Sequence, residues 1–229
     1  MPMIAYIVTE TREKYNDMDC HAIKHDLEKL SGDLCLVMHF SQVTRELIEE
    51  IAPWAICHSG GGTPHTDYDV LQRDEYTWLI TQSGVPQIGF CGGHQIIAEM
   101  FGCDVGIMRE LGPDEADYNP GYYPGTFKES GVWPVEIVAE DPLFEGLSSP
   151  VRVREAHRSE IKQLPEGFRL LASSRDCRIQ AMLHEEMPLY GTQFHPESRM
   201  EHYPDGHRIV ANFFSIARQR GRWSQATIA

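Results

Sequence analysis

The sequence has no apolar stretch near the ~20 residues that a membrane-spanning helix needs, and its N-terminus lacks the basic and then apolar order of a signal peptide. We therefore expect no membrane partner. The six cysteines show neither the close pairs of a metal site nor the density of a disulfide framework, which predicts reduced thiols and a cytoplasmic protein. The histidines also lack the spacing of metal ligands, so we expect no metal and no cofactor.

A basic surface is missing as well. The 229 residues contain 20 Lys and Arg against 34 Asp and Glu, a formal net charge of −14. A nucleic-acid partner would require a basic face, so none is expected. No repeat, low-complexity tract or linker divides the sequence, and a chain of this length can bury one substantial core. We therefore predict a single domain over residues 1–229.

The first part of the chain alternates short apolar runs with helical patterns. This alternation is typical of an α/β protein with a parallel sheet. The expected strands are Ile4–Val8, Leu34–Phe40, Trp54–His58 and Val85–Phe90, and the expected helices are Asp19–Leu30, Thr44–Ile51 (with Thr44 as its cap), Tyr68–Thr81 and residues 93–101.

The regular alternation ends after residue 101. Residues 112–131 hold three prolines and three tyrosines without periodicity, which predicts a loop insertion. Such a segment forms either a flap beside a functional site or a plain surface loop. The later apolar runs favour hairpin-like strands and a closing amphipathic helix. These elements are expected at Val132–Ala139, Val151–Glu155, Phe168–Ser173, Ile179–Leu183, Pro188–Phe194 and, for the helix, Gly206–Arg220.

A cysteine stands where a predicted strand turns into a predicted helix. Residues 89–97 read GFCGGHQII, which places glycines two residues before and two residues after Cys91. A tight strand-to-helix turn holds its central residue in a strained conformation and admits only small neighbours. The N-terminus of the helix favours an anion, so Cys91 is a candidate thiolate nucleophile.

A histidine and a carboxylate follow another predicted strand about a hundred residues later. Residues 191–197 read GTQFHPE, which places His195 two residues before Glu197. An imidazole that is oriented by a carboxylate can activate a thiol. The sequence therefore predicts a catalytic triad of Cys91, His195 and Glu197 and thiol-based acyl chemistry.

Acyl transfer also requires donors for a developing oxyanion. The backbone N–H of Gly92, directly after the nucleophile, is one candidate donor. The glycine-rich turn after the strand at residues 54–58 supplies a second candidate, Gly61. Glycine suits both positions because the backbone must approach the substrate closely.

These motifs resemble those of the class I (triad-type) glutamine amidotransferases. Pro86–Gln95 is similar to the nucleophile motif of the family, and Thr192–Glu197 is similar to its His-Pro-Glu motif. The stretch from Ala156 to Phe168 and the segment Asp205–Phe214 are similar to the corresponding parts of GMP-synthetase-type glutaminase domains. The resemblance implies a flavodoxin-like, three-layer α/β fold with a mainly parallel central sheet.

The resemblance also implies a reaction and a substrate site. Cys91 would attack the γ-amide of glutamine, release ammonia and form a glutamyl thioester that water hydrolyses. Gln95, and the backbone around Arg158 and Ser159, match the family positions that hold the amino-acid end of the substrate.

Three functions remain open from the sequence. The first is a glutaminase that feeds ammonia to a separate synthetase subunit. The second is a stand-alone γ-glutamyl hydrolase or peptidase that acts on γ-glutamyl amides or conjugates. The third is a non-catalytic regulatory relative, which the intact triad disfavours.

Overall fold

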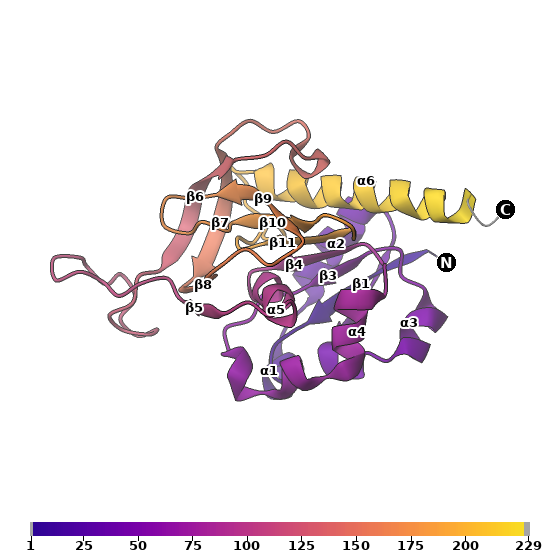
Figure 1. Ribbon diagram of the computed structural model, residues 1–229, viewed down its shortest axis with the longest axis horizontal. Coiled ribbons are helices and arrows are strands. Elements are labelled where there is room, and N and C mark those ends of the chain that lie inside the picture. Colours follow the sequence, from indigo (N-terminus) through magenta and orange to yellow (C-terminus); the bar gives the residue numbers. More distant parts are fainter. Residues whose placement is uncertain (1, 227–229) are drawn as a thin grey trace.

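The computed structural model describes the backbone of residues 2–226 and the side chains of residues 2–219. Its main sheet has nine strands in the order β2-β1-β3-β4-β11-β10-β9-β6-β7 (Figure 1). These strands are β1 (Met3–Val8), β2 (Leu34–His39), β3 (Ile56–His58), β4 (Gln87–Phe90), β6 (Glu129–Ile137), β7 (Val151–His157), β9 (Phe168–Ser173), β10 (Ala181–His184) and β11 (Leu189–Thr192). A separate two-stranded sheet pairs β5 (Val105–Ile107) with β8 (Ser159–Ile161).

Six α-helices and four short 3₁₀ turns surround the sheets in the described part of the chain. The helices are α1 (Arg12–Asp17), α2 (His21–Ser31), α3 (Arg45–Ile51), α4 (Asp74–Gln82), α5 (Gly92–Met100) and α6 (Asp205–Ala226). The 3₁₀ turns are η1 (Phe40–Gln42), η2 (His65–Asp67), η3 (Asp69–Gln72) and η4 (Pro142–Phe144). None of the helices in residues 2–226 combines the length and the apolar character required to cross a bilayer.

The parallel half of the main sheet consists of β2, β1, β3, β4 and β11. If β11 is counted as the fifth strand, this order is the flavodoxin-like order 2-1-3-4-5. The other half, from β10 to β7, pairs antiparallel. The expected α/β fold is confirmed. The sheet is mixed because the strands beyond β11 in the sheet order, from β10 to β7, pair antiparallel.

Helices cover both faces of the parallel half and produce three layers (Figure 1). Successive residues of a strand point to opposite faces, so a strand between two helical layers is apolar on both sides. β1 illustrates this pattern: Ile4, Tyr6 and Val8 belong to one hydrophobic cluster, and Ala5 and Ile7 belong to the other. The first cluster includes residues of α2 and α6, and the second includes residues of α3, α4 and α5.

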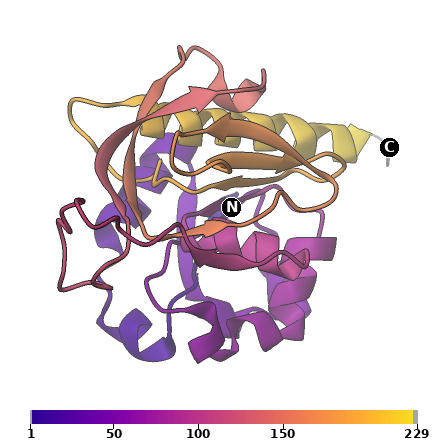
Figure 2. The same cartoon turned by 60° about the vertical axis from the view of Figure 1, so that its left-hand side comes forward.

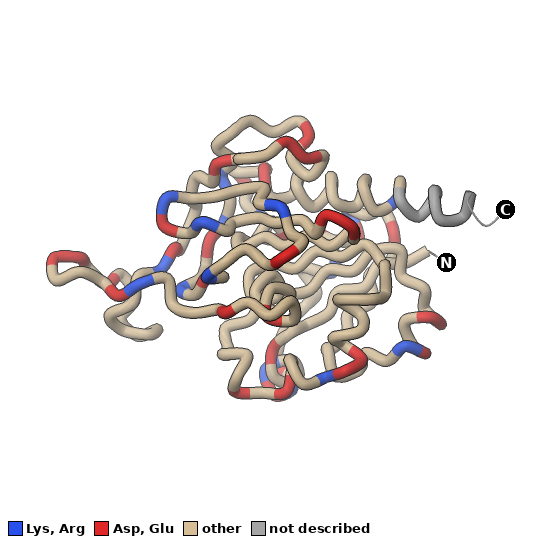
Figure 3. Tube along the Cα trace, in the orientation of Figure 1, with Lys and Arg blue, Asp and Glu red and all other residues tan. Residues whose placement is uncertain are grey.

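The predicted loop insertion is an extended segment between β5 and β6. It projects from the body of the fold in Figures 1 and 2, and it carries acidic residues (Figure 3). Ion pairs fasten it internally: Arg109 bonds Glu115 at 2.6 Å, and Lys128 bonds Asp117 at 2.9 Å. Its C-terminal limit differs from the prediction because residues 129–131 already belong to β6, where they pair with β7.

Other differences concern short elements. The helix predicted at Tyr68–Thr81 starts at Asp74, because residues 65–72 form η2 and η3 instead. The sequence did not indicate α1, β5 or β8. These elements have only three to six residues, too few to display a hydrophobic period. Thr44 caps α3 as predicted, since its side chain accepts a hydrogen bond from the backbone nitrogen of Leu47.

Candidate active site

Cys91 lies in a strained turn between β4 and α5. Its backbone has φ 45° and ψ −102°, a conformation that residues other than glycine rarely adopt. A Cβ on Gly89 would lie 2.6 Å from the carbonyl carbon of Gly93, and a Cβ on Gly93 would lie 2.9 Å from the Cβ of His58. The predicted need for small neighbours is therefore confirmed, because the start of α5 packs directly on its own strand β4 and on the neighbouring strand β3.

Cys91 and His195 are brought together by adjacent parallel strands. β4 pairs with β11, and the backbone nitrogen of Cys91 donates to the carbonyl of Thr192 at 2.8 Å. The carboxyl ends of parallel strands meet at one edge of the sheet, where α/β proteins commonly bind ligands. The chain after β11 then carries His195 to the same edge as the sulfur.

The imidazole of His195 is held by Glu197. Its Nδ1 lies 2.8 Å from Oε1 of Glu197, whose side chain is buried. Burial lowers the pKa of His195, but the charges of Glu197 and Cys91, together with hydrogen bonds to both side chains, raise it well above the ordinary value. The structure thus brings the three predicted triad residues together in an arrangement that favours an imidazolium beside the sulfur.

The glycine-rich turn after β3 lies against both the nucleophile and the imidazole. A Cβ on Gly60 would approach Cε1 of His195 to 2.7 Å, and a Cβ on Gly92 would approach the backbone nitrogen of Gly61 to 2.6 Å. The backbone nitrogens of Gly61 and Gly92 have no hydrogen-bond acceptor within the described residues. Both predicted oxyanion donors are therefore neighbours and available to a ligand.

Glu10 anchors this turn, and the sequence did not identify it. Its carboxylate accepts hydrogen bonds from the backbone nitrogens of Gly62 and Thr63 and from the Thr63 hydroxyl. Burial raises the pKa of Glu10, but these hydrogen bonds, with one from the Thr11 backbone, lower it to about 2. The signal available was an acidic residue two positions after the first strand, at the edge of the sheet that carries Cys91.

A pocket of about 240 Å³ opens beside the sulfur. Cys91, Gln95, Arg158 and Ser159 all line it, as do Gly61 and the loop residue Tyr122. The predicted substrate contacts therefore surround the same pocket as the nucleophile.

Arg158 connects this pocket to the projecting loop. Its guanidinium lies 3.4 Å from the ring centroid of Tyr123 and 5.8 Å from that of Tyr122. Its Nη1 also donates to the hydroxyl of Ser159 at 2.7 Å. A cation stacked on aromatic faces holds the loop beside the pocket.

Gln193 is a second residue that the sequence did not identify. It is fully buried, and its Nε2 donates to the sulfur of Cys91 at 3.5 Å. Its Oε1 accepts from Nε2 of Gln95 at 3.0 Å, and Gln95 also donates to the carbonyl of Ser159 at 2.9 Å. Gln193 is two residues before His195, on the same strand end, so its position in the sequence was the available signal.

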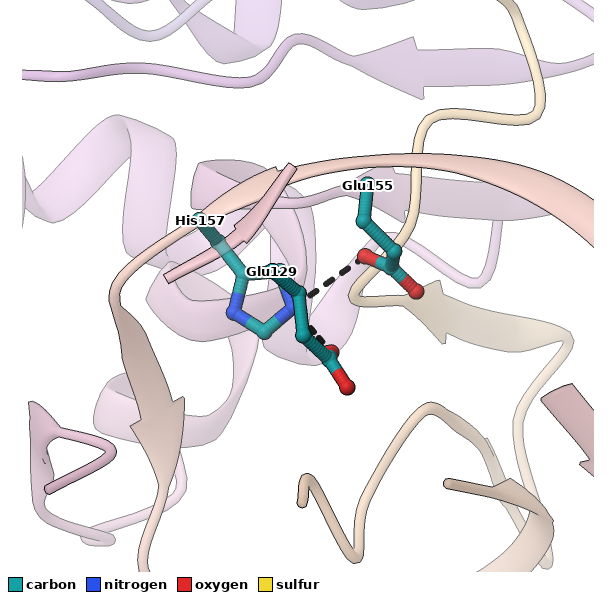
Figure 4. Close-up of side chains that lie close together, drawn as sticks. All are labelled: Glu129, Glu155 and His157. Carbon is teal, nitrogen blue, oxygen red and sulfur yellow. Dashed lines mark hydrogen bonds and ion pairs between the residues drawn. The ribbon is translucent and has the colours of Figure 1, made fainter. Parts of the chain in front are cut away.

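A buried cluster of Glu129, Glu155 and His157 lies next to the pocket (Figure 4). Nε2 of His157 is 2.8 Å from Oε2 of Glu129 and 3.1 Å from Oε2 of Glu155. Carboxylate and imidazole groups this close are also donor types that bind divalent metals. A proton on Nε2 of His157 lies between the two carboxylates in this arrangement. No local pattern indicated this cluster, since Glu129 and His157 are 28 residues apart.

Comparisons with known proteins agree with this geometry. The family model described as glutamine amidotransferase class-I matches residues 17–217. A subunit of the glutamine-hydrolyzing GMP synthase of Pyrococcus abyssi is 37% identical over 175 residues, which cover 75% of this chain and 79% of that protein. The subunit of the same name from Archaeoglobus fulgidus is 40% identical over 199 residues, which cover 87% of this chain and 93% of that protein.

A solved structure has the same fold. The crystal structure of a Thermoplasma acidophilum protein, described as a candidate GMP synthase subunit, superimposes with a TM-score of 0.76 at 27% sequence identity. The match covers 98% of each chain. The resemblance identified from residues 86–95 and 192–197 is thereby confirmed across the chain. The chain belongs to the class-I glutamine amidotransferase family.

Proposed function

We propose that this chain hydrolyses the γ-amide of glutamine through a thioester on Cys91 and supplies the ammonia to a separate synthetase subunit. The observation that carries the proposal is the strained Cys91 beside the paired His195 and Glu197, at the mouth of a pocket. The relatives named as subunits of a glutamine-hydrolyzing GMP synthase support the same assignment and indicate the kind of synthetase partner.

The reaction begins with attack on the γ-carbonyl carbon of glutamine by the sulfur of Cys91. The N–H groups of Gly61 and Gly92 stabilise the oxyanion that develops, each by roughly 3–4 kcal/mol of the activation barrier. The protonated His195 donates its proton to the amide nitrogen, the C–N bond breaks, and ammonia leaves. A water molecule then gives a proton to His195 and attacks the thioester, which releases glutamate and restores the Cys91 thiolate beside the protonated His195.

The pocket supplies groups for the amino-acid end of glutamine. The guanidinium of Arg158 suits the α-carboxylate, since it can form two parallel hydrogen bonds with a carboxylate. Both donor contacts of Gln95 are made by its Nε2, which leaves its Oε1 to accept from the α-ammonium group. Ser159 contributes through its backbone and its hydroxyl.

A second candidate function is hydrolysis of γ-glutamyl amides or conjugates. A larger cavity of about 950 Å³ adjoins the pocket under the projecting loop. The two share Tyr122, Ala156 and His157 as lining residues. This cavity would accommodate a leaving group much larger than ammonia, and its size is the observation that favours the second function.

We also propose that residues 1–229 form a single domain in the cytoplasm. One continuous sheet contains strands from Met3 to Thr192, which supports a single domain. The six cysteines are free thiols, and thiols persist in a reducing compartment.

One experiment separates the two candidate functions. The purified chain is incubated with glutamine or with γ-glutamyl peptides, and glutamate release is followed with and without the synthetase subunit. We expect slow turnover of glutamine by the isolated chain and faster turnover when the synthetase is bound. Rapid cleavage of γ-glutamyl peptides without cleavage of glutamine would contradict the first function and support the second.

A further inference from the structure

The ring of His157 is surrounded by hydrogen-bond acceptors on both sides. Its Nε2 faces the carboxylates of Glu129 and Glu155 at 2.8 and 3.1 Å (Figure 4). Its Nδ1 faces the backbone carbonyl of Ser159 at 3.0 Å. A neutral imidazole has one donor and one acceptor nitrogen, so it would place a lone pair against an oxygen. With Glu129 and Glu155 ionised, both ring nitrogens of His157 therefore carry a proton.

The two glutamates hold this imidazolium firmly. Glu129 also accepts from the Ser174 hydroxyl at 3.0 Å and from Nε2 of Gln180 at 2.9 Å, so its carboxylate is fixed from three sides. Glu155 is completely buried, and His157 is the ion-pair partner of its carboxylate. Burial lowers the pKa of His157, but the hydrogen bond to Glu129 and the neighbouring carboxylate of Glu155 raise it to about 10.

A continuous set of hydrogen bonds leads from His157 to the nucleophile. The carbonyl of Ser159 accepts from His157 and also from Gln95, at 3.0 and 2.9 Å. The same Nε2 of Gln95 donates to Oε1 of Gln193 at 3.0 Å. Gln193 in turn donates to the sulfur of Cys91 at 3.5 Å.

We propose that His157 is a positioning residue that Glu129 and Glu155 hold as an imidazolium. His157 fixes the carbonyl of Ser159. Through Gln95 it also fixes the side-chain amide of Gln193, the hydrogen-bond donor that stabilises the thiolate of Cys91. This inference rests on the proposed function only in assigning Cys91 as the nucleophile. His157 contributes in two ways. It orders the hydrogen bonds that end at the sulfur, and its positive charge lies close enough to Cys91 for the two to interact.

Other charged groups also face this cluster. Burial, with a smaller contribution from the charge of His157, lowers the pKa of His94 to about 3, so His94 is neutral. Glu155 interacts with His195 as well as with His157. His157 and His195 therefore both interact with Cys91 as cations, while His94 does not.

The test measures the thiolate of Cys91 without requiring glutamine turnover. Alkylation of Cys91 by iodoacetamide is followed against pH by mass spectrometry of the peptide that contains Cys91. The variant is His157→Asn combined with Glu155→Gln, which removes the imidazolium without leaving Glu155 as an unpaired buried charge. Glu155→Gln alone is the matched control, and His184→Asn, a histidine that does not line the pocket, is a second control.

We expect the alkylation midpoint of the double variant to lie about one pH unit above that of Glu155→Gln, with alkylation about tenfold slower at neutral pH. Gln193→Met, which removes the donor to the sulfur, should shift the midpoint in the same direction. An unchanged midpoint in a folded double variant would overturn the inference. A stoichiometric metal ion in the wild-type protein that is lost in the double variant would also overturn it.

Nitrogen NMR of the wild-type protein provides a measurement that depends on no variant. Both ring nitrogens of His157 should show the chemical shifts of protonated nitrogens up to pH 8, and a neutral ring at that pH would overturn the inference. If glutamine is not hydrolysed while the alkylation shift is observed, the proposed function fails and the positioning role stands.

Discussion

The backbone nitrogen of Gly61 lies against the α-carbon of Gly92, so closely that a Cβ on Gly92 would come within 2.6 Å of it. One of these glycines follows β3 and the other begins α5. Their contact aligns two N–H groups beside the sulfur of Cys91. A side chain between them would separate the two donors that the mechanism uses together.

Gly92→Ala should therefore lower kcat by roughly 100-fold, the effect typical of losing one oxyanion donor. The Cβ would push the Gly60–Gly62 turn away from the nucleophile. Steady-state kinetics and thermal unfolding check this expectation, with Gly121→Ala as the control, since a Cβ there meets no atom closer than 3.8 Å. A kcat within twofold of wild type would contradict the assignment of the oxyanion donors.

Glu197→Gln should move the pH profile. Glu197 raises the pKa of His195, so the imidazolium form of wild type persists to higher pH than that of a free histidine. Removing the charge lowers this pKa, and the alkaline limb of kcat/KM should shift to lower pH. We also expect kcat to fall by roughly 10²–10⁴-fold, as in other triads that lose the orienting carboxylate. An unshifted alkaline limb would show that another group sets the protonation of His195.

Glu10 should make stability depend on pH in the acid range. Its pKa in the folded protein is about 2, below its ordinary value of 4.5, so the ionised form is favoured by folding. This contribution is complete above about pH 4.5 and is lost as the pH falls through 2. Urea unfolding between pH 5 and 2 should therefore show a steeper loss for wild type than for Glu10→Gln. Glu13→Gln, on the exposed face of α1, is the control and should follow wild type.

Tyr123→Ala should weaken substrate binding more than catalysis. The ring lies 3.4 Å from the guanidinium of Arg158, and it holds both that side chain and the projecting loop beside the pocket. A cation–π contact of about 0.5–2 kcal/mol corresponds to an increase in KM of about 2–30-fold. Tyr118→Ala is the matched control because Tyr118 is 97% exposed. Equal kinetics for the two variants would show that the loop plays no part in substrate binding. Deletion of the loop is a second test, and unchanged kinetics and partner binding after the deletion would lead to the same conclusion.

The parts of the fold and site that could be predicted share a local signal. The strand-to-helix turn at Cys91 could be predicted because the glycines on both sides of the cysteine indicate that the helix packs closely on the strand. The structure shows this close contact between Gly89 and Gly93. The strands of the parallel half could be predicted from the sequence because a strand that is buried on both faces is a short apolar run. Gln95 was predicted as a substrate contact from the family resemblance alone, and it lines the pocket while also bonding Ser159 and Gln193.

The parts that were missed depend on contacts between distant segments. Glu10 reaches Gly62 across 52 residues, and Gln193 reaches Cys91 across 102 residues. Glu129 and His157 meet because β6 and β7 pair in a register that no local pattern specifies. Short elements such as β5 and β8 also depend on this assembly, since neither segment would form a strand without the other.

The most direct test of the central claim is glutamate release from glutamine by wild type and by Cys91→Ser, combined with labelling by an electrophilic glutamine analogue. We predict a single label on Cys91, protection of Cys91 by glutamine, and no measurable turnover by Cys91→Ser. Turnover by Cys91→Ser, or a label on another cysteine that abolishes activity, would contradict the role of Cys91 as the nucleophile.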